Sequence, residues 1–270
     1  MPRSFPYRSL LWGGLSCLAW PVASQVITPL PFGQSNHLVT PLPFGQRSAS
    51  PMRPLSRRAA PHTAAAMVGT IVAQWNMDET SGTTMYDSSG NGNNGTTTNV
   101  VMTGAGYQFD GRSSKVVVKN SPSLALGSKD FSFSVTFQTS VVPPQGTDYD
   151  LIRKGTGVST GGEFKLEIVY NRGVGKPKCV VSDSLGNTAS ERGNVNVADG
   201  QVHTVTCTKS GTAVTQQVDS LPPSAATGNI TGPITTIKPL TIGIKAPTAT
   251  GIGADWYNGT IVNASISIAQ

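Results

Sequence analysis

Oxygen-bearing side chains in and around one glycine-rich loop are the first candidates for chemistry in this sequence. The loop DSSGNGNNG follows a turn-rich stretch, and its glycines allow backbone carbonyls to turn inward. Ca²⁺ takes about six to eight oxygen ligands from carboxylates, amides and carbonyls. Asp and Asn are also ordinary turn residues that bond their own backbone, so a plain turn stays open beside a structural calcium site. The candidate ligands are Asp78, Asp87, Asn91, Asn93 and Asp110.

Carboxylate pairs for hydrolysis are the second possibility, and the sequence gives them little support. Glu163 and Glu167 share one face of an expected strand, but strand rise separates them by about 13 Å and Lys165 lies between them. A retaining glycosidase needs about 5–5.5 Å. No GxSxG, HExxH or phosphate-loop motif occurs. His203 shares a strand face with Cys207, which favours a packed structural histidine. We therefore expect no catalytic residue and no enzyme activity.

Two cysteines remain once a secretory signal containing Cys17 is removed. Cys179 and Cys207 both fall on expected strands. In an exported protein a residual pair predicts a disulfide, which loop entropy would make worth about 3–4 kcal/mol. Two buried free thiols are the alternative. Neither His62 nor His203 lies at metal-ligand spacing from the cysteines, so no zinc site is expected.

Aromatic side chains are the candidates for binding sugar, because an exposed ring can stack on a pyranose face. Amides and carboxylates would then bind the hydroxyl groups. Any such ring could instead fill the core or the rim of a sheet, and Trp75 on the first expected strand is a core residue. The candidate ligand-binding residues are Tyr149, Tyr170, Trp256 and Tyr257.

Alternating hydrophobicity predicts the elements that must position these groups. The segment 131–138 (FSFSVTFQ) places its apolar residues on one face, and 163–170 (EFKLEIVY) buries its apolar residues opposite Glu163, Lys165 and Glu167. Gly, Pro, Asn or Asp separates most segments, and no amphipathic helix occurs. The pattern predicts an all-β sandwich, a jelly roll of two antiparallel sheets. Further strands are expected at 70–75, 115–119, 178–182, 202–208, 213–218, 240–244 and 260–268.

The first quarter of the chain has a different composition. Residues 1–24 resemble a signal peptide, with a positive start, a short apolar core and small residues for cleavage. That apolar run is too short to span a bilayer. Residues 25–66 form a proline-rich basic linker with two copies of TPLPFGQ, which we expect to be disordered and extended. A docking motif is the alternative for this repeat. We expect one folded domain over 67–270, secreted to the extracellular space.

The net charge of +6 belongs entirely to this first quarter. Residues 1–66 contain six arginines and no acid, so residues 67–270 carry 14 basic and 14 acidic groups. Nucleic-acid binding requires basic groups gathered on a folded face. No nucleic-acid partner is therefore expected.

Four ordered motifs resemble the opening of the LamG-like group of the concanavalin A-like lectin/glucanase superfamily. They are WNMDETSG (75–82), DSSGNGNNG (87–95), YQFDG (107–111) and SPSLAL (121–126). The resemblance implies a jelly roll that recognises carbohydrate or glycoprotein, often with structural calcium. Relatives commonly carry two acids in the last strand, where this chain has Val262 and Asn263, which weakens the implied calcium site. Val202 also replaces a tryptophan often found before the histidine.

Together these features predict a secreted, non-catalytic module that binds a glycan or glycoprotein ligand. An extracellular adhesion or structural domain that binds protein is the first alternative, and an enzyme of the glycoside hydrolase fold is the second. Exposed aromatics beside amides would favour the glycan module. A flat apolar patch would favour adhesion, and two facing carboxylates in a cleft would favour the enzyme.

Overall fold

A computed structural model describes residues 69–157 and 160–270, and almost all regular structure in them is β. Two short 3₁₀ helices, η1 (Pro122–Leu124) and η2 (Ile252–Ala254), interrupt the strands. No helix in these ranges is long and apolar enough to cross a membrane. The predicted signal peptide and linker lie outside the described residues.

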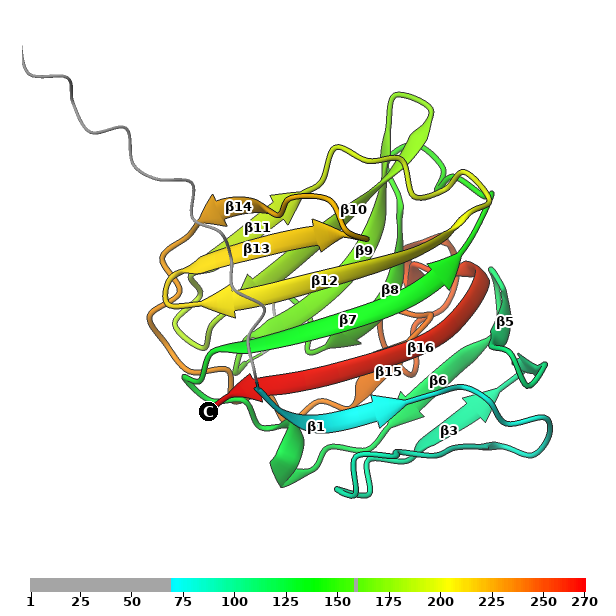
Figure 1. The fold of residues 1–270 in the computed structure, drawn as a ribbon, viewed down its shortest axis with the longest axis horizontal. Helices are drawn as coiled ribbons and strands as arrows, with labels where there is room; N and C mark the ends of the chain where they lie inside the picture. The colour runs from blue at the N-terminus through cyan, green and yellow to red at the C-terminus, as the bar shows by residue number, and fades with distance from the viewer. Residues whose placement is uncertain (1–68, 158–159) are drawn as a thin grey trace, which may run out of the picture. The chain divides into compact units, whose positions relative to one another are not determined.

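Eight strands form the first antiparallel sheet, called here the front sheet (Figure 1). The long strand β16 (Asn258–Ala269) pairs along one edge with β7 (Phe131–Gln138). Its other edge is shared, because residues 258–261 pair with β5 and residues 264–269 pair with β1. The remaining members are β1 (Gly69–Trp75), β4 (Val101–Met102), β5 (Tyr107–Asp110), β12 (Val202–Ser210), β13 (Ala213–Val218) and β14 (Ser224–Thr227).

The back sheet also has eight strands, in the order β11-β10-β9-β8-β15-β6-β3-β2. Their bounds are β11 (Thr188–Arg192), β10 (Val174–Ser182), β9 (Glu163–Asn171), β8 (Asp148–Lys154), β15 (Leu240–Ile242), β6 (Lys115–Val118), β3 (Gly95–Thr98) and β2 (Thr84–Met85). The two sheets lie face to face (Figure 1). The predicted jelly-roll sandwich of two antiparallel sheets is confirmed.

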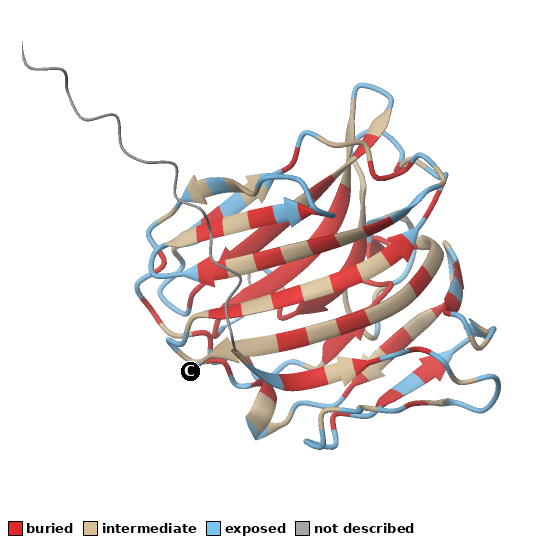
Figure 2. Ribbon diagram, in the orientation of Figure 1, coloured by how far each residue is buried: buried red, intermediate tan, exposed pale blue. Residues whose placement is uncertain are grey.

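The core lies between the sheets and follows the predicted alternation. Phe131 and Phe133 on β7 point inward and meet Phe164 of β9 at ring-centroid distances of 5.5 and 5.1 Å. On the outer face of β7, Ser134 pairs with the hydroxyl of Thr206. Figure 2 shows this alternation as bands along β7, β12 and β16. Burying each such phenylalanine contributes about 1.5–3 kcal/mol.

Strand β9 departs from the prediction, because both of its faces are buried over residues 163–168 (Figure 2). The apolar face packs into the core as expected. The charged face, with Glu163, Lys165 and Glu167, was expected to face solvent but is also closed. Opposite charges on β8 and β10 compensate these groups, which makes the burial tolerable.

Several strands were not expected from the sequence. Strand β8 carries charges on one face that is buried rather than exposed, so its sequence DYDLIRK lacks a simple alternation. Strand β10 starts at Val174, four residues before the predicted start. The prediction began the strand too late because Gly175 and Pro177 are residues that usually favour a turn. Six short strands were also missed, and each has five residues or fewer: β2, β3, β4, β5, β11 and β14.

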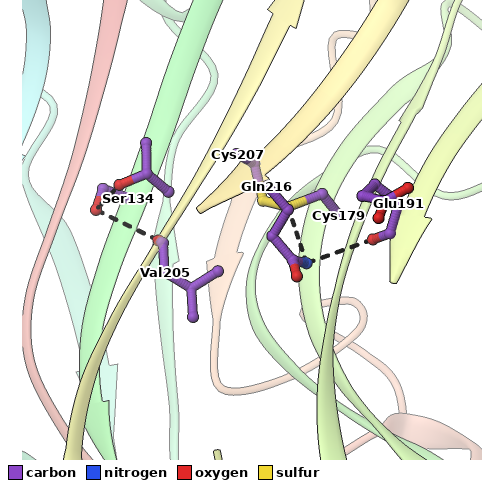
Figure 3. Close-up of a disulfide and its surroundings, with 7 residues drawn as sticks. Ser134, Cys179, Glu191, Val205, Cys207 and Gln216 are labelled. Atoms are coloured by element: carbon purple, nitrogen blue, oxygen red, sulfur yellow. Dashed lines mark hydrogen bonds between the residues drawn. A yellow bond between two sulfur atoms is a disulfide. The ribbon is translucent and has the colours of Figure 1, made fainter. Parts of the chain in front are cut away.

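The predicted disulfide between Cys179 and Cys207 is confirmed (Figure 3). Cys179 lies on β10 of the back sheet and Cys207 on β12 of the front sheet, with Cα atoms 5.7 Å apart. Both are fully buried. Gln216 on β13 donates from Nε2 to the carbonyl of Glu191 at 3.3 Å beside the bridge. The disulfide therefore joins the two sheets through the core.

Candidate ligand-binding hollow

Two of the four predicted ligand-binding aromatics, Tyr149 and Trp256, line the same hollow of about 370 Å³. Tyr149 lies on β8, whereas Trp256 lies between η2 and β16. We call this site the aromatic hollow. Its lining residues are Gly111, Arg112, Pro144, Thr147, Asp148, Tyr149, Gly251 and Trp256.

Backbone hydrogen bonds fix the segment that carries Trp256. On one side the N–H of Asp150 donates to the carbonyl of Asp255 at 3.0 Å. On the other side the N–H of Gly111 donates to the carbonyl of Tyr257 at 3.0 Å. Trp256 is thereby held between β8 and the turn after β5, and both of its neighbours in sequence are buried. The indole itself is only half-buried and lines the hollow.

Tyr257 was predicted as a binding residue, and that prediction is wrong because its side chain is fully buried. The ring makes edge contacts with Phe109, Phe137 and Tyr149, and its hydroxyl donates to the carbonyl of Gln138 at 2.9 Å. It therefore belongs to the core beneath the hollow.

Tyr170 is partly exposed near the end of β9, opposite Gly175 of β10. It is not among the residues that line the aromatic hollow. The structure brings together Tyr149 and Trp256, but does not bring Tyr170 to the same site.

The polar groups of the hollow complement its rings. Asp148 supplies a carboxyl group and Arg112 an exposed guanidinium group. Thr147 adds a hydroxyl group, which donates to the carbonyl of Pro144 at 2.8 Å. Burial raises the pKa of the Tyr149 hydroxyl, so this ring stays neutral. The arrangement can hold a ligand that has both an apolar face and hydrogen-bonding groups.

Next to Asp148, the charged face of β8 and β9 carries a network of buried ion pairs. Arg153 donates from Nη1 to Asp150 Oδ2 at 2.8 Å and from Nη2 to Glu163 Oε2 at 2.6 Å. Glu167 accepts from the ammonium groups of Lys165 and Lys178, the latter at 3.1 Å. The members of this network are Asp148, Asp150, Arg153, Glu163, Lys165, Glu167 and Lys178.

The carboxyl groups of this network have different pKa values. Burial, with help from Glu167 and Asp150, raises the pKa of Asp148 to about 8. Burial also raises the pKa of Asp150 to about 6, although Arg153 opposes it. For Glu167, burial raises the pKa, but Lys165 and the second lysine outweigh it and hold the pKa below its usual range. Asp148 is thus the carboxyl group that retains a proton near neutral pH.

The predicted calcium loop is held by protein hydrogen bonds. Asp87 Oδ1 accepts from the N–H groups of Gln74 and Ser89, and Oδ2 accepts from the N–H of Asn93 and the hydroxyl of Ser89. Asn91 donates from Nδ2 to the carbonyl of Val72 at 3.2 Å. These bonds describe a tightly closed turn. Calcium at this loop stays a prediction.

Asn93 acts as a buried link between this loop and the rest of the sandwich. Its Nδ2 donates to the carbonyl of Val72 at 2.8 Å, and its Oδ1 accepts from the hydroxyl of Ser121 at 2.5 Å. Its backbone carbonyl accepts from the indole N–H of Trp75 at 2.7 Å. Trp75 is fully buried, as expected of a core residue.

The remaining predicted ligands do not join Asp87. Asp110 caps its own turn, because Oδ1 accepts from the N–H groups of residues 112–114. Asp78 is exposed in the segment between β1 and β2. In the part of the chain that the structure describes, the only three acids, histidines or cysteines near enough to share an ion are Asp148, Asp150 and Glu167. The expectation that Asp78 and Asp110 converge with Asp87 is therefore wrong.

His203 is buried between two carboxylates, as expected of a structural histidine. Its Nδ1 lies 2.8 Å from Asp219 Oδ2, and its Nε2 lies 3.1 Å from Asp199 Oδ1. Burial lowers its pKa, but the bonds to Asp219 and Asp199 outweigh burial and raise the pKa above its usual value.

Sequence reasoning missed Asp148 and Arg112 as residues of the hollow. For Asp148, the available signal was that DYDLIRK, like EFKLEIVY, carries both acidic and basic residues among its apolar ones. Pairing places Asp150 opposite Glu167 and Arg153 opposite Lys165. Only the pairing of these two strands shows that both charged faces coincide.

No protein-family model and no curated protein matches the chain. The binding domain of botulinum neurotoxin serotype D has a TM-score of 0.56 at 14% identity, covering 74% of this chain and 49% of that one. Domain 4 of AbnA, a GH43 extracellular arabinanase from Geobacillus stearothermophilus solved with arabinotriose, has a TM-score of 0.52 at 14% identity, covering 75% and 95%. Trypanosoma rangeli sialidase, solved with sialic acid, has a TM-score of 0.52 at 17% identity, covering 73% and 30%. The chain thus spans about half or less of the toxin domain and the sialidase. At these identities the likeness is one of fold alone, a β-sandwich.

Proposed function

We propose that this protein is a secreted, non-catalytic module that binds a glycan in the aromatic hollow. The observation that carries the proposal is the meeting of Tyr149, Trp256 and Asp148 in one hollow. An indole face packs on the apolar face of a sugar ring, while a carboxyl and a guanidinium group bond its hydroxyl groups. The buried disulfide supports export, because such bonds persist in oxidising compartments.

The similar structures support the same class of ligand. One of them is AbnA domain 4 in complex with arabinotriose, and another is the sialidase in complex with sialic acid. A third, concerning botulinum neurotoxin type C, describes cell entry that depends on two ganglioside molecules, at a TM-score of 0.54 and 15% identity. The chain covers 48% of that toxin structure. A LamG-like assignment is compatible with this fold and remains part of the proposal.

Glycan binding is tested by titrating the full chain against a panel of soluble neutral and sialylated oligosaccharides. We expect binding to one class, weakened at least tenfold by Trp256→Ala, a change of about 1.4 kcal/mol. Tyr86→Ala is the matched control, because Tyr86 is 61% exposed and lies outside the hollow. Binding that is unchanged in Trp256→Ala, or an absence of binding to every glycan, contradicts the proposal.

Two neighbouring carboxyl groups of unequal pKa also suggest an acid–base pair, which is the signature of a glycoside hydrolase. The geometry weighs against this second candidate. Asp148 lines the hollow, but Asp150 and Glu167 are closed to solvent and bonded to Arg153, Lys165 and Lys178. A substrate would reach one carboxyl group only. Release of reducing ends from any panel glycan, abolished by Asp148→Asn, would favour the enzyme instead.

A further inference from the structure

Two aspartates of β8 each have a buried carboxylate oxygen without a hydrogen-bond partner. Among the described residues, three buried side-chain oxygen or nitrogen atoms lack a hydrogen-bond partner, and two of them are Asp148 Oδ1 and Asp150 Oδ1. Asp150 is fully buried, and only its Oδ2 is bonded, to Arg153. Leaving a buried acceptor without a donor is unfavourable, and more so when the group is charged. Each such atom in a folded protein needs an explanation, and a bound ion is one.

The same two residues belong to an acidic cluster, defined here as Asp148, Asp150 and Glu167. One carboxylate oxygen from each lies within 4.8 Å of the others. The pairing of β8 with β9 creates this cluster, because Asp150 lies opposite Glu167 beside a register shift between residues 150 and 152. The three carboxylates therefore meet through strand pairing and not through closeness in sequence.

The charge balance of the surrounding network is compatible with a bound cation. The network has four carboxyl groups, and its three cationic groups are Arg153, Lys165 and Lys178. The network therefore has one carboxyl group more than it has cations, and a bound cation would take the place of the proton on Asp148. The neighbouring pair Lys245–Asp255 is balanced, at 2.6 Å.

The aspartates of the predicted calcium loop do not have such unsatisfied oxygens. Both oxygens of Asp87 already accept two donors each, and Asp110 Oδ1 accepts three N–H groups. An ion there would have to displace bonds that close the turn. At Asp148 and Asp150, an ion would instead supply the absent partner.

We propose that the acidic cluster binds a hard divalent cation such as Ca²⁺, with Asp148 and Asp150 as its main protein ligands. The donors are all oxygens, which suits calcium or magnesium rather than zinc or copper. Asp148 also lines the aromatic hollow, which gives the ion a path from solvent. Glu167 adds negative charge, but its oxygens hold Lys165 and Lys178. These lysines oppose the ion, so we expect a dissociation constant on the order of 10⁻⁴–10⁻³ M, as in extracellular calcium modules.

The test uses the full chain, Tb³⁺ luminescence sensitised by the nearby tyrosine and tryptophan, and displacement by Ca²⁺. We expect one calcium-displaceable site and a rise in Tm of about 3–5 °C with 5 mM Ca²⁺ relative to EDTA. Asp148→Asn should weaken calcium binding at least tenfold. Asp78→Asn, which removes an exposed carboxylate of the predicted loop site, is the matched control and should bind as the wild type does.

A variant with the opposite effect separates ion binding from loss of structure. Lys165→Met removes a cation that contacts Glu167, and should tighten calcium binding at least threefold. A purely structural role for the network predicts no such gain. Absence of calcium binding up to 5 mM, or equal binding in the wild type and Asp148→Asn, overturns the proposal. Loss of binding in Asp87→Asn with retention in Asp148→Asn would also overturn it, and would return the site to the glycine-rich loop.

Discussion

Removing the bridge between Cys179 and Cys207 should lower the free energy of unfolding by about 3.5 kcal/mol. The two cysteines are 28 residues apart, and the loop-entropy model gives about this value for a closed loop of that length. For a domain of roughly 200 residues, each kcal/mol lowers Tm by about 2–4 °C, so the expected loss is about 10 °C. The effect should be global, because the bond joins the two sheets (Figure 3).

The assay is urea unfolding of Cys179→Ala/Cys207→Ala, followed by tryptophan fluorescence. The slope of free energy against urea should increase, because an unfolded chain without the bridge exposes more surface. The single variant Cys179→Ala is the matched control, since it also lacks the bridge but retains one sulfur in the core. Single and double variants that agree within about 1 kcal/mol would assign the loss to the bridge. A double variant within about 1 kcal/mol of the wild type, with an unchanged slope, would refute the reasoning.

Three further changes test the remaining assignments. The raised pKa of His203 contributes stability that is present below pH 6.5 and is lost as pH rises through the folded-state pKa; urea titrations from pH 5 to 9 should show this loss, and His203→Gln should flatten it. Asp183, which accepts five hydrogen bonds and has its pKa lowered to about 2, contributes stability present above about pH 3.8 and lost as pH falls through 2. Asp183→Asn should lower stability by about 2 kcal/mol at pH 7, and an unchanged midpoint would contradict that role. Tyr257→Phe should lower stability by about 1 kcal/mol through loss of the bond to Gln138, but should leave glycan affinity unchanged, whereas a fall in affinity would restore Tyr257 as a binding residue.

The long strands of the front sheet could be predicted because their environment is simple. On β7 one face meets the core and the other stays at the surface, so burial selects apolar residues at every second position. The same logic placed Cys179 and Cys207 on strands and their side chains in the core. Strand β8 could not be predicted in this way, because its charged side chains are buried among opposite charges and its sequence has no simple period.

The candidate site was only half accessible to sequence reasoning. Tyr149 and Trp256 were identified by residue type, but nothing in their spacing separated them from the buried Tyr257. Trp256 and Tyr257 are consecutive, and the turn at Asp255, with φ of 54°, helps decide which ring faces the hollow. Backbone bonds from Asp150 and Gly111 hold that turn, and both come from distant parts of the chain.

The sequence by itself determined the sandwich, its core strands and the disulfide, because period-two burial and an isolated cysteine pair are local or nearly local properties of the chain. Tertiary structure alone decided that Asp148, Asp150 and Glu167 meet, and that Asp148 also faces the aromatic hollow. The physical reason is register. A shift of one residue between β8 and β9 would turn every charged side chain of β8 to the other face, and no local pattern in either strand specifies that pairing.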